Sequence, residues 1–307
     1  MRFIMELNGI VSAVITPFSS DGESVNEAEL RAIVESGVLS GLGGFVPCGG
    51  TGEFATLSFD ERQKVTEICI EQAAGRSAVM AQVGACSTRE AIAHAKHAQA
   101  AGADAMMLAT PYYEGISFEG VRRFYHDIAA AVSLPICIYN FPPSMGVAYD
   151  PDRVAQLMEE IPSVKYIKDS SGDFGLLNAL VTGSTGVKVF AGEDILIVPS
   201  FTQGCAGVIN GSANFIAPAC VKMFDAAKKG DFETLRSVWD SVNPLVRAVI
   251  SDHYNGGVKA AVAALGFATG PIRKPYDELP AERFALIQDI ISKMDPSLLN
   301  RTKQSLI

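Results

Sequence analysis

The sequence predicts a (β/α)8 barrel followed by a C-terminal helical region. Eight short apolar runs typical of strands recur along the chain, and stretches with helix-start signals separate them. A doubly wound open sheet has the same periodicity. The spacing of the runs shortens without a linker or a break in composition before about residue 212, which favours the closed barrel. We expect a catalytic barrel over residues 1–229, with residues 230–307 packed on it as helices.

The expected strands are rich in β-branched and apolar residues. Several are apolar at consecutive positions, as expected for strands buried on both faces of a parallel sheet. In chain order they cover residues 11–15, 44–47, 78–83, 105–109, 135–139, 164–168, 187–190 and 206–210.

Capping residues mark the expected helices between these strands. A side-chain oxygen followed three residues later by an acid begins several of them, and Pro151 follows Asp150 at another start. The cap-and-acid pairs are Asn26 with Glu29, Ser58 with Glu61, and Ser87 with Glu90. Glycines that can end a helix in the left-handed conformation precede strands at Gly41, Gly75, Gly102 and Gly204. Residues 231–250, 257–265 and 280–294 are the expected C-terminal helices.

Composition narrows the class of protein. Of the 307 residues, 48% are hydrophobic and 19% are charged, as in a globular protein with a large core. The net charge of -9, without a long basic run, argues against nucleic-acid and anionic-membrane partners. The apolar N-terminus is short and contains Glu6, and no run is long enough to span a bilayer. Six scattered cysteines without a C-x-x-C pair fit reduced thiols in the core of a cytoplasmic protein.

The active site of such a barrel lies at the carboxyl ends of its strands. After the second strand, the glycines of residues 49–53 would let backbone N–H groups approach an anion, and Thr51 adds a hydroxyl donor. A carboxylate or phosphate could be held there. A tight turn without a ligand has the same spacing, whereas a dinucleotide fingerprint and a P-loop do not fit.

A lysine ends the sixth strand. Lys165 and Lys168 are three residues apart, so their side chains point to opposite faces of a strand, and Lys168 is nearer the reactive end. A desolvated lysine there has a lowered pKa and can attack a ketone as a neutral amine. An ion-paired or surface lysine is the alternative that sequence logic leaves open.

Other polar side chains fall near strand ends. Tyr139 ends the fifth strand, where a phenol could pass a proton beside an amine, or pack as a core aromatic. Tyr112 and Tyr113 follow the fourth strand and suit rim packing or a subunit contact. His94 and His97 are the nearest pair of candidate metal ligands, but no strand-end acid accompanies them. We therefore predict no metal site and no nucleotide cofactor.

The chain resembles the dihydrodipicolinate synthase and N-acetylneuraminate lyase family of class I aldolases. The resemblance runs from Ile15-Thr16-Pro17-Phe18 to the C-terminal helices. Its markers are Gly-x-Thr-Gly-Glu at 49–53, Pro111-Tyr112-Tyr113, Tyr139-Asn140-x-Pro142 and Ile167-Lys168-Asp169. In this order and at strand ends, they are highly specific together.

The resemblance implies a role for each matching residue. Lys168 would be the Schiff-base lysine, Tyr139 the proton-transfer phenol, and Thr51 the carboxylate ligand together with its neighbouring N–H groups. Tyr113 matches a tyrosine that is shared across a tight dimer interface, within a homotetramer built as a dimer of dimers. Ile209 matches a residue that lines the pocket under the lysine.

Two departures from the family pattern bear on the substrate. Gly50 stands where dihydrodipicolinate synthases carry a hydroxyl residue of their proton relay. Ser144 stands where they carry the arginine that anchors the aldehyde's carboxylate, and serine cannot replace a planar bidentate donor. The run Gly-Gly-Thr-Gly-Glu-Phe instead resembles the deoxy-oxoglucarate dehydratase branch.

The leading expectation is a lyase acting on a small 2-oxo acid through an imine on Lys168. It would release pyruvate by retro-aldol cleavage or dehydrate a 2-oxo-3-deoxy sugar acid. Candidates for the polar lining of the substrate pocket are Ser144, Asn210, Ser212 and Glu193, besides Gly50 and Thr51. One alternative is 4-hydroxy-tetrahydrodipicolinate synthesis from pyruvate and aspartate semialdehyde. A non-catalytic paralogue that binds a metabolite is a second, because fold does not dictate function.

Overall fold

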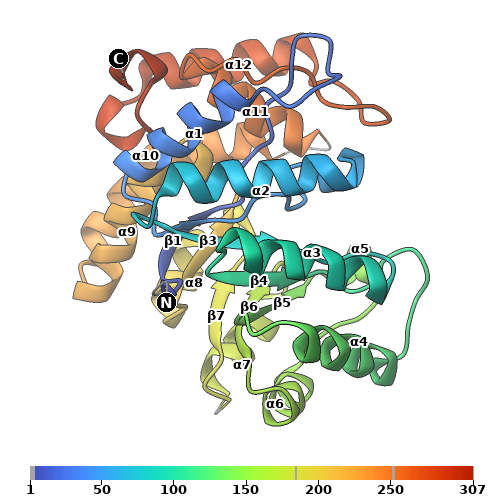
Figure 1. The fold of residues 1–307 in the computed structure, drawn as a ribbon. Helices are drawn as coiled ribbons and strands as arrows, with labels where there is room; N and C mark the ends of the chain where they lie inside the picture. Colours follow the sequence, from blue (N-terminus) through green and yellow to red (C-terminus); the bar gives the residue numbers. More distant parts are fainter. Residues whose placement is uncertain (1–3, 184, 251–252, 307) are drawn as a thin grey trace.

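A closed barrel of parallel strands forms the centre of the molecule (Figure 1). The computed structural model describes residues 4–183, 185–250 and 253–306, and within these ranges eight strands pair in chain order. They are β1 Gly9–Ser12, β2 Gly44–Phe45, β3 Ala78–Gln82, β4 Ala105–Leu108, β5 Ile136–Asn140, β6 Val164–Asp169, β7 Lys188–Ala191 and β8 Gly207–Asn210. Strand β8 pairs in parallel with β1, with Ile10 opposite Val208. The barrel is therefore closed, and the predicted fold class is confirmed.

Helices surround the barrel and connect consecutive strands. They are α1 Glu27–Leu39, α2 Phe59–Ala73, α3 Thr88–Ala101, α4 Phe118–Ala131, α5 Pro142–Met145, α6 Pro151–Glu160, α7 Phe174–Thr182, α8 Ile197–Gln203 and α9 Ala217–Lys229. The predicted caps are confirmed, and at α2 the Ser58 and Glu61 side chains each bind the other's backbone N–H. All four glycines expected at helix ends have positive φ.

The strands contribute side chains to two apolar layers. Side chains that point inward fill the barrel, including Val11, Met80, Met107 and Phe190. Alternate residues point outward and pack under the helices in a second, larger cluster. Tyr139 packs against the inner layer at its edge, so the fifth strand directs this phenol into the mouth of the barrel.

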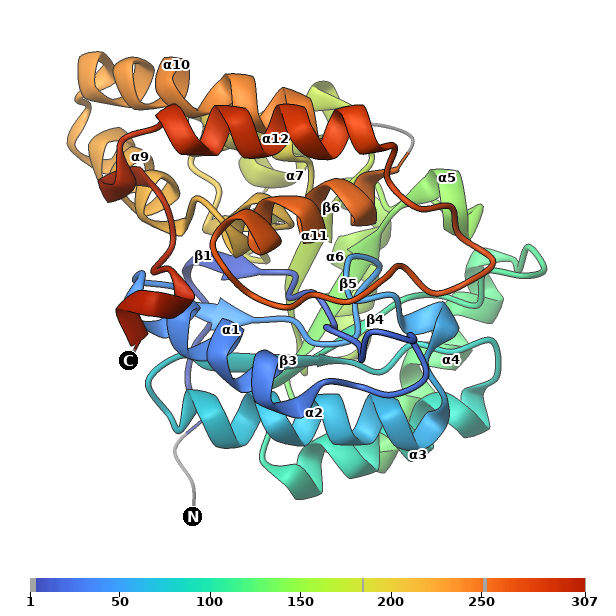
Figure 2. The ribbon, with the colours of Figure 1, turned by 90° about the horizontal axis from the view of Figure 1, so that it is seen from above.

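Three further helices follow the barrel. They are α10 Phe232–Val249, α11 Tyr254–Ala264 and α12 Ala281–Lys293. Helix α10 packs on α9, and α12 packs on both α10 and α11 (Figure 2). The predicted C-terminal helices are thus confirmed, while the division of the chain at residue 229 stays a prediction. Helix α11 begins at Tyr254, three residues before the predicted start, and this difference brings two more side chains to the barrel mouth.

Some details of the sequence analysis were wrong besides the start of α11, and strand β2 ends at Phe45 rather than residue 47. Strand β1 ends at Ser12 rather than residue 15, because the chain then leaves the ladder, although Ala13 N–H still bonds to the Asn210 carbonyl at 3.0 Å. Cys86 is exposed instead of packed in the core. It lies in the loop that leads from β3 to the cap of α3 at Ser87. The other five cysteines are buried and free.

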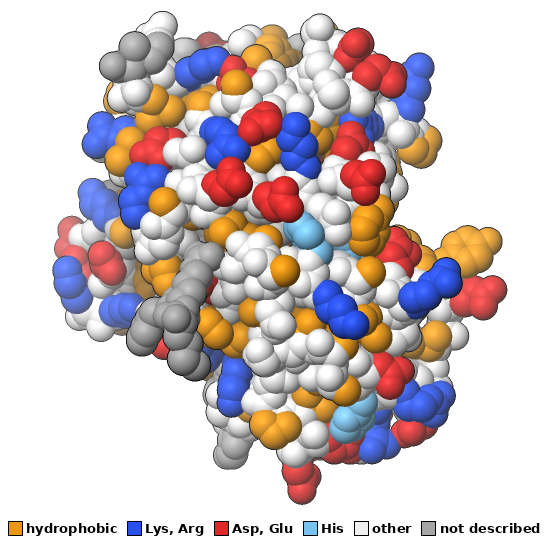
Figure 3. Space-filling model, in the orientation of Figure 1, with side chains coloured by type: hydrophobic (Ala, Val, Ile, Leu, Met, Phe, Trp, Pro, Cys, Tyr) orange, Lys and Arg blue, Asp and Glu red, His pale blue; other side chains and the backbone are white. Residues whose placement is uncertain are grey.

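The surface carries charges of both signs. On the face of Figure 3, acidic and basic side chains alternate over α1 and α2, where Arg31 contacts Glu27 and Glu71, and Arg76 contacts Glu35. None of the helices within the described ranges is long and apolar enough to cross a membrane.

Candidate functional site

A cavity of about 450 Å³ opens at the carboxyl ends of the strands. Its wall combines residues that follow β2, β5, β6, β7 and β8 with the first residues of α11. The side chains most relevant to chemistry are those of Thr51, Tyr139, Lys168, Glu193, Asn210 and Tyr254. The structure therefore brings together in one cavity the lysine, the phenol and the glycine-rich loop selected from the sequence.

Lys168 lies in this cavity and is only 6% exposed. Its register partner on β5 is Tyr139, and its Nζ lies 4.6 Å from the centroid of the Tyr139 ring. Within the described residues, Lys168 forms no ion pair. Lys165 is exposed on the outer face of β6, as its odd spacing from Lys168 predicted.

A glycine makes room for the lysine. A Cβ at Gly192, just after β7, would lie 2.9 Å from Cε of Lys168 and 1.9 Å from Oγ of Ser170. Any side chain here would displace the amine or the Ser170 hydroxyl. The close approach explains why a glycine follows β7 at this point.

A buried polar pair lies directly behind the two reactive side chains. Asn140 and Asp169 are the next register partners after Tyr139 and Lys168. Asn140 Nδ2 donates to Asp169 Oδ1 at 2.7 Å, and the Ser171 hydroxyl donates to the other carboxylate oxygen. Burial raises the pKa of Asp169, which these hydrogen bonds oppose. The pair ties the ends of β5 and β6 together and so fixes the spacing of Tyr139 and Lys168.

Contacts with other parts of the chain hold the glycine-rich loop after β2, and in one of them the Arg273 N–H donates to Glu53 Oε2 at 3.0 Å. The Thr16 hydroxyl donates to the Gly52 carbonyl at 2.8 Å, and Asn255 Nδ2 donates to the Gly50 carbonyl at 3.1 Å. Glu53, in the left-handed conformation at φ 58°, forms a buried ion pair with Lys259 at 2.6 Å. With the loop held this way, Thr51 lies in the cavity wall, and its N–H has no protein acceptor among the described residues. The hydroxyl and the N–H of Thr51 can therefore bind a carboxylate.

The part of the cavity wall that follows β7 is acidic. Burial, and then the neighbouring Asp194, raise the pKa of Glu193. Asp194 accepts hydrogen bonds from the Ser212 N–H at 2.8 Å and from the Tyr254 hydroxyl at 2.6 Å. Among the described residues that line the cavity, Lys168 is the only lysine or arginine.

The remaining predicted residues lie in different places. Asn210 lines the cavity, and its buried Nδ2 has no hydrogen-bond partner among the residues that the structure describes. Ile209 is fully buried in the inner layer of the barrel below it. Ser144 is exposed on α5 and Tyr113 is 85% exposed, and neither lines the cavity of this single chain. Their predicted roles therefore stay predictions.

The sequence analysis missed Tyr254 and Asn255. Both line the cavity, but they lie on α11, and no spacing rule connects that helix with the carboxyl ends of the strands. The positions of Asn140 and Asp169 in the sequence could have predicted their contact. Each follows a candidate reactive residue by one position, and neighbouring parallel strands place such residues side by side.

The two helix histidines have other partners. His94 is buried on α3 and stacks on Phe59 with ring centroids 4.4 Å apart, while His97 contacts Glu67 at 2.7 Å. Burial lowers the pKa of His94 to about 3. The described ranges contain no cluster of three or more residues of metal-binding type.

The buried ion pair gives a prediction on stability. Lys259→Met should lower the free energy of unfolding by roughly 3–5 kcal/mol, because it leaves the Glu53 carboxylate buried without its cation. Arg236→Ala is the control, since its ion pair with Asp240 is exposed and should contribute little. Urea unfolding measures both. Equal midpoints for Lys259→Met and the wild type would show that the pair does not stabilise the fold.

Comparison with known proteins identifies the family to which the chain is similar. The model of the dihydrodipicolinate synthetase family matches residues 6–294. A 4-hydroxy-tetrahydrodipicolinate synthase of Methanospirillum hungatei is 34% identical, over 94% of this chain and 99% of that protein. One of Methanothrix thermoacetophila is 37% identical, over 93% and 96%. A prophage protein from E. coli K12, of the dihydrodipicolinic acid synthase family and solved in complex with pyruvate, has TM-score 0.88 and 25% identity, over 93% and 98%.

Proposed function

The chain belongs to the dihydrodipicolinate synthetase family and is a lyase, and from this premise we propose that it binds pyruvate, or another small 2-oxo acid, as an imine on Lys168. The observation that carries the proposal is a buried lysine beside the Tyr139 ring in a strand-end cavity, with no ion pair to any residue that the structure describes. The imine chemistry needs neither a metal nor a nucleotide.

The first step is imine formation. The neutral Lys168 amine attacks C2 of the 2-oxo acid. The C2 oxygen takes up the proton that the nitrogen loses and a second proton from water, and it then leaves as water. The carboxylate of the 2-oxo acid faces the hydroxyl and N–H of Thr51. Loss of a proton from C3 then forms the C2–C3 double bond and moves the electron pair of the C2–N double bond onto nitrogen. The product is an enamine, which is nucleophilic at C3.

The relatives favour condensation as the next step. Their shared name is that of a synthase, and they support the alternative of the sequence analysis better than its leading expectation. In condensation, C3 of the enamine forms a bond with the aldehyde carbon of aspartate semialdehyde. The aldehyde oxygen takes a proton from Tyr139. Attack of the semialdehyde's own amino group on C2 then breaks the bond to Lys168, which leaves as the free amine.

The lining of the cavity favours a second candidate. Aspartate semialdehyde carries a carboxylate, yet the wall after β7 presents Glu193 and Asp194, and Ser144 does not line the cavity. A hydroxylated substrate fits this wall better, because hydroxyl groups do not need a positively charged side chain to bind them. The same imine would then release pyruvate by breaking the C3–C4 bond of a 4-hydroxy-2-oxo acid, or lose the C4 hydroxyl as water.

A substrate panel separates the two candidates. We expect borohydride to trap pyruvate on the wild-type chain, and condensation with aspartate semialdehyde to be slow, since each lost charged hydrogen bond costs about 1.5–3 kcal/mol. The panel contains aspartate semialdehyde with pyruvate, 2-oxo-3-deoxy sugar acids, N-acetylneuraminate and hydroxyproline-derived imino acids. It is scored by NADPH oxidation with dihydrodipicolinate reductase, by pyruvate release and by water loss. Fast coupled NADPH oxidation would establish the synthase, and absence of trapping would support a non-catalytic binding protein.

We also propose a role for Tyr113 between subunits. Its ring is 85% exposed on the loop after β4, which suits a side chain that enters the cavity of a neighbouring chain in a homotetramer. The assembly and this contact follow from the family resemblance, with the exposed ring as their support.

A further inference from the structure

Helix α11 directs three side chains at the mouth of the barrel. Tyr254 and Asn255 begin the helix and line the cavity. Lys259 lies four residues after Asn255, on the same face of the helix. Asn255 and Lys259 both contact the loop after β2, at Gly50 and Glu53. The C-terminal region thus takes part in building the site rather than covering it.

Asn255 acts on the side of the cavity that receives the carboxylate. Its Nδ2 donates to the Gly50 carbonyl at 3.1 Å. Gly50 is followed directly by Thr51, and the same carbonyl also accepts from the Glu53 N–H at 3.0 Å. Asn255 therefore adds a side-chain bond to a backbone turn at the peptide that carries the Thr51 N–H. A Cβ at Gly50 would meet no atom within 4 Å, which means that packing alone does not hold this part of the loop.

Tyr254 acts on the loops after β7 and β8. Its hydroxyl accepts from the Gly211 N–H at 3.1 Å and donates to Asp194 Oδ2 at 2.6 Å. Asp194 follows β7 and Gly211 follows β8, so one phenol joins the loops of two strands. Burial raises the pKa of Tyr254 well above its usual range, which keeps the hydroxyl proton in place as a donor.

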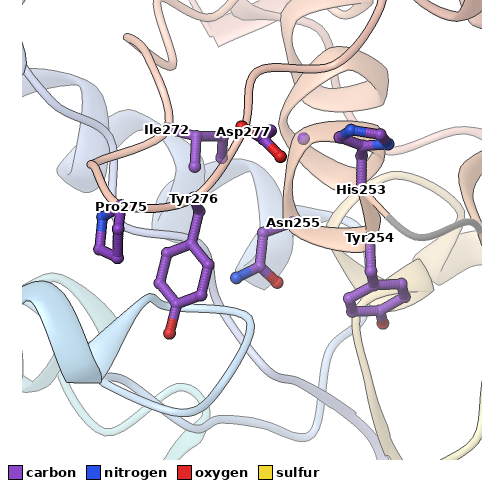
Figure 4. A pocket seen from close by; sticks show the side chains of 8 residues that line it. His253, Tyr254, Asn255, Ile272, Pro275, Tyr276 and Asp277 are labelled. Carbon is purple, nitrogen blue, oxygen red and sulfur yellow. The ribbon is translucent and has the colours of Figure 1, made fainter.

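The same two residues separate the cavity from a second pocket. This outer pocket of about 420 Å³ is lined by Tyr254 and Asn255 together with His253, Ile272, Tyr276 and Asp277 (Figure 4). Tyr254 and Asn255 therefore form a shared wall, and their hydrogen bonds to the strand loops hold that wall in position.

We propose that Asn255 and Tyr254 are positioning residues with separate tasks. Asn255 sets the Thr51 loop for the carboxylate of the 2-oxo acid. Tyr254 sets Asp194 and Gly211 for the second reactant, or for the part of the substrate beyond C3. The inference rests on the proposed imine chemistry. It predicts that substitutions of Asn255 and of Tyr254 affect different kinetic constants.

Asn255→Ala tests the first task. We expect the pyruvate concentration for half-maximal borohydride trapping to rise about tenfold, because the loss of one hydrogen bond has an effect of this size. The final extent of trapping should not change. Asn255→Gln keeps the amide and should recover part of the affinity. Asn243→Ala is the matched control, because Asn243 binds Arg247 on α10, away from the cavity. An unchanged half-saturation in Asn255→Ala would overturn this task.

Tyr254→Phe tests the second task. Half-saturation by pyruvate should stay within about twofold of the wild type, while kcat/KM for the fastest panel reaction falls about tenfold or more, because Gly211 N–H and Asp194 lose their partner. Tyr276→Phe removes an equivalent hydroxyl from the outer pocket and should change neither value. If Asn255→Ala and Tyr254→Phe each changed both the half-saturation by pyruvate and kcat/KM, α11 would have only a structural role. Absence of trapping in the wild type would instead reject the proposed function itself.

Discussion

Replacing Lys168 with alanine is expected to abolish borohydride trapping of pyruvate and all measurable turnover. The amine is the nucleophile of the proposed reaction, and Lys168 is the only lysine or arginine among the described residues that line the cavity. The fold should survive, because the side chain is a buried amine that pairs with no carboxylate in the described part of the chain, and its loss removes a desolvation cost. Thermal unfolding should therefore occur at the wild-type temperature or above it.

Lys165→Ala is the matched control for this experiment. Lys165 lies on the same strand, but it is exposed on the outer face of the barrel. Its loss should leave trapping and turnover near the wild-type values. Mass spectrometry of the trapped protein identifies the modified lysine directly. Trapping that persists in Lys168→Ala and disappears in Lys165→Ala would contradict the assignment.

The repeating units of the barrel could be predicted because each signal is local. An apolar run, a capping residue such as Ser58 and a glycine such as Gly102 act within a few positions of the chain. Their repetition, without a break in composition, indicated one closed sheet. The limits of individual strands were less certain, and β1 shows why. The apolar run continues past Ser12, but strand pairing ends there, and pairing depends on residues far away in sequence.

The reactive centre was predictable to a similar extent. Lys168 and Tyr139 end neighbouring strands, so the barrel had to bring them close together. The role of Gly192 could not be read, because only the structure shows that Ser170 and Lys168 occupy the space of a Cβ there. Tyr254 was missed for the same reason, since its contact with Asp194 joins residues 60 positions apart.

Tyr139→Phe is expected to separate imine formation from turnover. The phenylalanine ring keeps the packing against Phe141, whose ring centroid is 5.8 Å away, and the ring face beside Lys168. The variant should therefore fold normally and still be trapped by borohydride with pyruvate. Every later step requires a proton to move to or from the substrate, and loss of a general acid or base lowers the rate by about 10²- to 10⁴-fold.

Rapid-quench trapping and steady-state turnover measure these two quantities on the same preparation. Because the hydroxyl takes part in proton transfer and the ring in packing, trapping should fall far less than kcat. A parallel loss of both would place Tyr139 in imine formation itself, and an unchanged kcat would remove it from the reaction. In that case the proton would have to come from another group in the cavity wall. Glu193 is the carboxyl there whose pKa burial raises, so Glu193→Gln would be the next variant to measure.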